Sequence, residues 1–176
     1  MAAIVQQDYP GVTWWCPQLP PSPERAMAQI LAGIAAWPVA AGFQGMAVVG
    51  SSLGGFYAAW VAEKMVCKAV LLNPAIHPAR DLQRFIGEQT AWHAPGERFF
   101  FKPEFIDELL KLEARAPTDL TNYLAVIAKG DEVLNWQEMA AHYSGAQIRL
   151  LEGGDHALSD FDDHLPAIFD FLKLAG

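Results

Sequence analysis

A serine in a glycine-rich turn is the first residue of this sequence whose type and setting suit covalent chemistry. Ser52 lies in segment 50–55, with the sequence GSSLGG, directly after an apolar run. This segment fits the pattern G-x-S-x-G, in which a nucleophilic serine sits on a sharp turn between a strand and a helix. Ser52 has glycines at both required offsets, and Ser51 does not. We expect Gly50 and Gly54 to be needed because a side chain at either position would collide with the neighbouring strand or helix.

Two later turns offer the partners that a nucleophilic serine needs. A serine hydroxyl is a poor nucleophile until a base takes its proton, and an acid must hold that base in the right tautomer. Asp131 follows the apolar run 123–128, and His156 follows the run 147–151. In this kind of site the order along the chain is serine, acid, histidine. The sequence therefore predicts Ser52 as nucleophile, Asp131 as acid and His156 as base.

Other acids and histidines compete for these roles. Glu132 and Asp155 are rival acids, but Asp155 adjoins His156, where a good hydrogen bond to the ring would need a strained backbone. Asp131 is therefore preferred. A lone histidine in a loop is usually a surface residue, but His156 follows the last expected strand beside a Gly-Gly turn. The remaining histidines rank below it: His77, His93, His142 and His164.

The negative charge that develops during acyl transfer needs two backbone N–H donors. Leu53, directly after the nucleophile and at a helix start, is one candidate. The second donor normally comes from an earlier loop that follows a strand, and no such loop is evident in the sequence. Asn73 and His77, at and after a strand end, and Trp136, near Asp131, are candidate substrate contacts.

The elements that must position these residues alternate along the chain. Strands are expected at 12–16, 46–50, 67–72, 123–128 and 147–151, and helices at 22–37, 52–64, 135–143 and 163–174. Strands that are apolar on both faces and alternate with helices indicate a mostly parallel sheet covered on both sides, which is the α/β class. The candidate residues then share the carboxyl edge of the sheet, where active sites of open α/β sheets lie.

The connection 76–121 is much longer than a normal crossover. It has helical patterns at 79–88 and 103–115 with aromatic residues between them. We interpret it as a helical lid over a pocket, because long insertions in compact domains are usually functional. The alternative is an ordinary pair of packing helices. The 176 residues otherwise suit a single domain, 1–176, with one core.

Composition excludes several classes of partner. The net charge of −8 argues against nucleic acid, and no apolar run is long enough to span a membrane. The first residues lack the features of a secretory signal, so we expect a cytoplasmic protein in which Cys16 and Cys67 stay reduced. No cysteine and histidine spacing is typical of a zinc site, so we expect no metal. The sequence does not indicate an oligomeric state.

Several sequence blocks occur together in an order that resembles one known family. They are 17–21, 48–55, 70–75, 130–134 and 152–157. These blocks are similar to those of the YqiA-type esterases of the α/β-hydrolase superfamily, and the resemblance covers essentially the whole chain. The family pattern carries over onto Ser52, Asp131 and His156. It implies hydrolysis of carboxylic esters or acyl thioesters, small-molecule substrates and no cofactor.

The sequence departs from this family at its beginning. Members begin with a strand that ends in a Tyr-Leu-His-Gly-Phe-like loop, followed by a helix whose end residues 1–8 resemble. We therefore expect the leading strand and the second oxyanion donor to be absent here, and an N-terminally extended version to be more stable and more active. The alternative is a shortened lineage in which the strand 46–50 pairs directly with 12–16.

Three functions fit the residues. The first is a serine esterase or thioesterase that works through an acyl-enzyme on Ser52. The second is a catalytically weak or inactive binding or scaffold protein with the same fold. The third is an acyltransferase or amidase that uses the same three residues, because one site can serve many acyl-transfer reactions.

Overall fold

The computed structural model describes residues 1–37, 45–91, 94–113 and 116–174. The chain divides into two compact units. The first comprises 1–16, 45–76 and 114–176, and the second comprises 17–44 and 77–113. Each unit is described below by itself.

The first unit holds a four-stranded parallel sheet with the order β1-β2-β5-β6. Its strands are β1 (Ala47–Ser51), β2 (Lys68–Leu72), β5 (Tyr123–Ala128) and β6 (Gln147–Leu151). Its helices are α1 (Ala2–Asp8), α3 (Leu53–Met65), α6 (Trp136–His142) and α7 (Leu165–Leu172), with single 3₁₀ turns at Leu120–Asn122 and Phe161–His164. Parallel strands joined by helices confirm the predicted α/β class.

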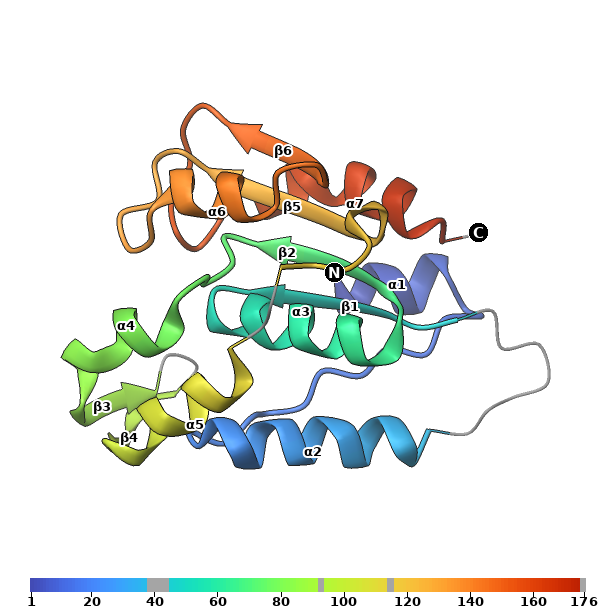
Figure 1. The fold of residues 1–176 in the computed structure, drawn as a ribbon. Coiled ribbons are helices and arrows are strands. Elements are labelled where there is room, and N and C mark those ends of the chain that lie inside the picture. Colours follow the sequence, from blue (N-terminus) through green and yellow to red (C-terminus); the bar gives the residue numbers. More distant parts are fainter. Residues whose placement is uncertain (38–44, 92–93, 114–115, 175–176) are drawn as a thin grey trace. The chain divides into compact units, whose positions relative to one another are not determined.

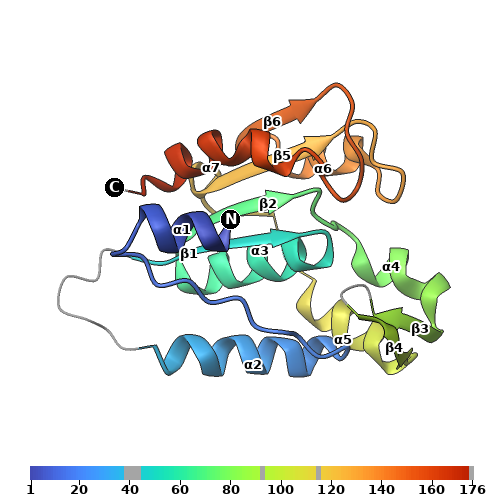
Figure 2. The same cartoon turned by 180° about the vertical axis from the view of Figure 1, so that it is seen from behind.

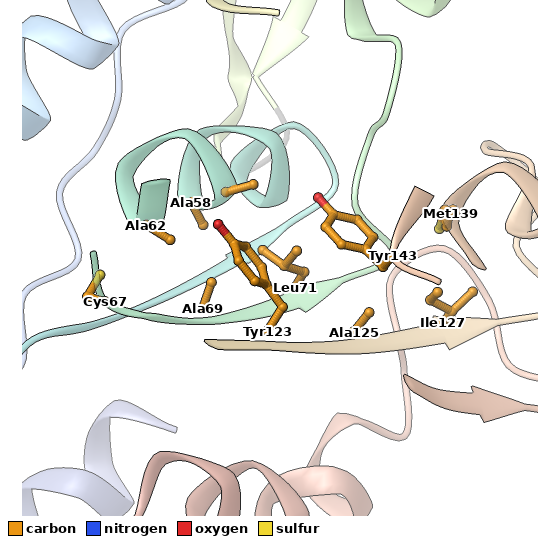
Figure 3. Close-up of a cluster of buried hydrophobic side chains, with 11 residues drawn as sticks. Ala58, Ala62, Cys67, Ala69, Leu71, Tyr123, Ala125, Ile127, Met139 and Tyr143 are labelled. Atoms are coloured by element: carbon orange, nitrogen blue, oxygen red, sulfur yellow. The ribbon is translucent and has the colours of Figure 1, made fainter. Parts of the chain in front are cut away.

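Helices cover both faces of this sheet. In Figure 1, α3 and α6 lie in front of the strands, and Figure 2 shows α1 and α7 on the opposite face. Alternate strand residues point to the two sides, so Leu71 and Ile127 belong to one core cluster while Val70 and Val126 belong to the other. Figure 3 shows the first cluster, with side chains from α3 above the strands. The strands are apolar on both faces because both faces are covered.

The second unit holds α2 (Pro23–Ala35), α4 (Pro78–Leu82), α5 (Glu104–Leu112) and a 3₁₀ turn at Gln83–Phe85. Ser22 caps α2, since its side chain accepts a hydrogen bond from the Arg25 N–H, as its position before proline predicts. The unit also contains an antiparallel hairpin, β3 (Gly87–Ala91) and β4 (Ala94–Phe101). The predicted helix at 79–88 is therefore wrong beyond its first turns, and the insertion is not purely helical.

The strand predicted at 12–16 is also absent from the described structure. The β-branched and aromatic composition of this segment favours an extended chain, but a strand also needs a partner with which to form a hydrogen-bonded ladder. No described strand pairs with it, and β1 has β2 as its one neighbour among the strands that the structure describes. The alternative pairing of the nucleophile strand with 12–16 is therefore contradicted.

Candidate active site

The turn that carries Ser52 lies between the end of β1 and the start of α3. Ser52 has φ 53° and ψ −121°, in a region that residues with a side chain rarely adopt. Its N–H donates to the Leu72 carbonyl at 2.9 Å, and its carbonyl accepts from the Ala75 N–H at 3.0 Å. Because both groups bond to the chain at the end of β2, the sharp turn is fixed to the neighbouring strand.

The glycines around this serine differ in how much space each leaves for a side chain. A Cβ on Gly50 would lie 2.0 Å from the Gly54 carbonyl oxygen, so no side chain fits there. A Cβ on Gly55 would lie 2.9 Å from the Pro74 Cβ. A Cβ on Gly54 would meet nothing within 4 Å. The predicted collision therefore holds for Gly50 and is wrong for Gly54. Gly54 contributes the backbone carbonyl with which a side chain on Gly50 would collide.

The structure brings the serine, histidine and aspartate into one hydrogen-bonded chain. His156 Nε2 lies 2.9 Å from Ser52 Oγ, and His156 Nδ1 lies 2.8 Å from Asp131 Oδ2. The Asp131 side chain is fully buried, and that of His156 is 21% exposed. A carboxylate can only accept, so Nδ1 carries the proton of the neutral ring and Nε2 is left to accept from the serine hydroxyl.

The two rival acids have other partners. Asp155 accepts from the Ser159 N–H at 2.9 Å and from the Ser159 hydroxyl at 2.6 Å, and these bonds lower the pKa of the Asp155 carboxyl. Glu132 Oε2 accepts from the backbone N–H of His156 at 3.0 Å. Neither of these contacts is to the His156 ring, which faces Asp131 instead.

Asn73 directly follows β2. It is fully buried, and its amide bonds to the backbone of the loop that carries His156 and to the last residue of β5. The contacts that the structure gives for the Asn73 side chain are therefore all to the protein backbone. That Asn73 contacts substrate stays a prediction.

Among the remaining candidates, Leu53 follows Ser52 directly, and no contact given for the described residues joins Trp136 to the triad. Leu53 is the first residue of α3, where backbone N–H groups have no partner within the helix. Trp136 packs against the core cluster of the first unit, with Lys129 Nζ 5.4 Å from its ring centre. His77 belongs to the second unit, where its Nδ1 lies 3.5 Å from Glu113 Oε1.

Two contacts at the site were missed by sequence reasoning. Glu132 bonds the main chain of the base, and Gly130 lets the two loops approach, since a Cβ there would lie 2.2 Å from the Gly154 carbonyl oxygen. The sequence signals are the glycines and the adjacent acids in GDE (130–132) and EGGDH (152–156). They indicate tight turns, but not that the two turns touch.

Metal and membrane features were sought among the described residues. No group of three or more histidine, cysteine, aspartate or glutamate residues in that part of the chain is placed to hold a metal ion. Within the same residues, no helix has the length and apolar character needed to cross a membrane. Cys16 is exposed and Cys67 is buried, and both are free thiols.

The sequence matches the model of one protein family. This family is described as "Uncharacterised protein family (UPF0227)", and its model matches residues 1–173. The match extends over both units and includes all three residues of the hydrogen-bonded chain.

Solved structures with a similar fold include proteins named as esterases and hydrolases. Est1E from Butyrivibrio proteoclasticus is 18% identical, with a TM-score of 0.59 over 86% of this chain and 68% of its own. Alpha/beta hydrolase domain-containing protein 10 from mouse is 20% identical, with a TM-score of 0.61, and the match covers 86% of this chain and 70% of the mouse chain. A pyrethroid hydrolase from Sphingobium faniae JZ-2 is 16% identical, with a TM-score of 0.61, and the match covers 98% of this chain and 91% of the hydrolase. These likenesses show the α/β-hydrolase fold.

Proposed function

The chain belongs to the UPF0227 family, the YqiA-like group that its sequence blocks resemble, and from that membership and its site we propose that it is a serine hydrolase. Its substrates would be small carboxylic esters or acyl thioesters. The observation that carries the proposal is the continuous hydrogen-bonded chain from Ser52 through His156 to Asp131. The α/β-hydrolase fold supports it, because this fold presents such a serine on a turn after a strand.

In the first half of the reaction, Ser52 Oγ attacks the acyl carbon and His156 Nε2 takes the hydroxyl proton. The carbonyl oxygen becomes an oxyanion, which the Leu53 N–H at the start of α3 would stabilise. The intermediate then collapses, the bond to the leaving oxygen or sulfur breaks, and Nε2 gives its proton to that atom, so that an alcohol or a thiol departs. Asp131 stabilises the imidazolium that exists between these two events.

In the second half, a water molecule attacks the acyl-enzyme. His156 Nε2 takes one proton of the water and returns it to Ser52 Oγ as the carboxylic acid departs. The free enzyme is regenerated without any cofactor. Trp136, the first residue of α6, is proposed as a contact for the acyl group.

A covalent probe tests the proposal directly. A fluorophosphonate should label the purified chain at Ser52, as mapped by mass spectrometry of the modified peptide. Labelling should be lost in Ser52→Ala and His156→Ala and kept in Ser51→Ala, the matched control one residue away. Labelled protein should then hydrolyse neither esters nor thioesters. A folded protein that resists labelling and turns over no substrate in such panels would favour the non-catalytic binding protein.

A further inference from the structure

The main chain of His156 is held by side chains that come from distant parts of the first unit. Asn73 Nδ2 donates to the carbonyl oxygens of Asp155 and His156, at 3.0 and 3.1 Å. Glu132 Oε2 accepts from the His156 N–H at 3.0 Å. Both the N–H and the C=O of the residue that bears the base are therefore bonded to side chains rather than to a regular ladder.

Both polar atoms of the Asn73 side chain are hydrogen-bonded to backbone groups. Asn73 is completely buried, its own N–H donates to the Val126 carbonyl at 2.9 Å, and its Oδ1 accepts from the Ala128 N–H at 2.8 Å. Both of its Nδ2 protons go to the base loop, residues 152–158. Its φ of 40° lies in the left-handed region, which asparagine tolerates better than most residues. One amide at the end of β2 thus links the end of β5 to the base loop.

The loop that carries the acid, residues 129–134, also touches the base loop through its backbone. The Gly130 N–H donates to the Gly153 carbonyl at 3.3 Å, and the space beside Gly130 is too small for any side chain. The base loop is therefore fixed from two sides, by Asn73 after the end of β2 and by the acid loop.

We propose that Asn73 and Glu132 are positioning residues for the base, which aim the His156 ring by fixing the peptide groups on either side of its Cα. The inference rests on the proposed hydrolase function. His156 reaches Ser52 and Asp131 from a single ring placement, with both distances below 3 Å. Since the ring has only two side-chain torsions, a shift of its main chain moves Nε2 directly. A misplacement of about 1 Å in such a site costs about 10²-fold in rate.

Two isosteric variants and one truncation test the contacts. Asn73→Asp keeps the shape and the acceptor for the Ala128 N–H, but it turns an oxygen toward two carbonyl oxygens. Glu132→Ala removes the acceptor for the His156 N–H, whereas Glu132→Gln keeps one in its amide oxygen. We expect kcat to fall about 10- to 100-fold in Asn73→Asp and Glu132→Ala, with KM nearly unchanged. Glu132→Gln should keep most of the kcat of the unaltered protein.

Asn135→Asp is the matched control, because Asn135 caps α6 by accepting from the Gln137 N–H and aspartate serves that role equally well. It should keep the kcat of the unaltered protein. Glu132 is exposed, so its variants are expected to fold even if Asn73→Asp does not.

A readout that needs no turnover separates this inference from the proposed function. The His156 Nδ1 proton, bonded to Asp131, should give a strongly downfield resonance in ¹H NMR of ¹⁵N-labelled protein. That resonance should shift or broaden in Asn73→Asp and Glu132→Ala and stay in place in Asn135→Asp and Glu132→Gln. The inference is overturned if folded Asn73→Asp and Glu132→Ala keep both the resonance and kcat. Absence of any Ser52-dependent turnover in the unaltered protein would overturn the proposed function, while the resonance would still report on positioning.

Discussion

Asp131 has a partner for each of its carboxylate oxygens. Oδ1 accepts from the Val133 and Leu134 N–H groups, both at 2.8 Å, and Oδ2 faces His156 Nδ1. An asparagine at this position could keep the two backbone bonds through its oxygen, and its NH₂ group would then face the ring. The ring would turn Nδ1 into an acceptor and carry its proton on Nε2. It could no longer take the proton of Ser52.

We therefore expect Asp131→Asn to lower kcat by about 10⁴-fold, the loss that a wrong tautomer causes in such sites. Its melting temperature should stay close to that of the unaltered protein, because the shape is conserved. Steady-state hydrolysis of a chromogenic ester and thermal unfolding measure the two quantities. Asp155→Asn, at a carboxylate that bonds to Ser159, is the control and should keep its kcat. Equal rates for the two variants would remove Asp131 from the acid role.

At the scale of elements, the sequence predicts the parts of the fold whose signal is local. Strands at 67–72 and 123–128 are predictable because both of their faces are apolar, and α2 because Ser22 and Pro23 mark its start. The hairpin of β3 and β4 is not, since Gly87–Ala91 is largely polar and Ala94–Phe101 contains proline and glycine. These two strands pair with each other, which composition alone does not indicate.

The same distinction applies to the candidate site. Ser52, Asp131 and His156 stand at strand ends, and strand ends of a parallel sheet meet at one edge, so their gathering follows from topology. The position of Asn73 depends on bonds to residues 82 and 83 positions further along the chain. No local pattern encodes such a contact. The sequence therefore shows only that Asn73 is a polar residue at a strand end and does not indicate its role.

The turn from β1 to α3 gives a prediction at this scale. Gly50→Ala should lower the free energy of unfolding by about 1–3 kcal/mol or more, because its Cβ would overlap the Gly54 carbonyl and the backbone must move. Gly54→Ala, in open space inside α3, should leave stability unchanged or raise it by up to about 1 kcal/mol. Chemical denaturation of both variants measures the difference. Similar losses in the two variants would contradict the difference in available space at Gly50 and Gly54.

At the scale of the whole molecule, three ionisable side chains share one buried cluster. Burial raises the pKa of Cys67 from 9.0 to about 11, and it also raises the pKa values of Tyr123 and Tyr143. The Tyr123 hydroxyl also donates to Glu63, which raises its pKa further. All three groups are neutral when protonated, so the folded state keeps their protons up to a higher pH than the unfolded state does.

Stability should therefore be constant with respect to these groups at neutral pH and fall as the pH rises above about 9, where an unfolded cysteine begins to lose its proton. The fall should continue toward pH 11, the folded pKa of Cys67. Denaturant titrations between neutral and alkaline pH measure it. Cys67→Ala should lessen the dependence between these two values, and an unchanged slope in that variant would contradict the contribution of Cys67.

The backbone of Ser52 has a consequence for the energy of the whole fold. A residue with a side chain at φ 53° and ψ −121° raises the free energy of the native state, by about 1–3 kcal/mol in such regions. Glycine adopts these angles without strain, so Ser52→Gly should melt at a higher temperature than Ser52→Ala, by about 2–4 °C for each kcal/mol relieved. Both variants would be inactive under the proposed mechanism. The inactive glycine variant would then have the higher melting temperature, and the active protein would be less stable because of the backbone conformation of the one residue that reacts.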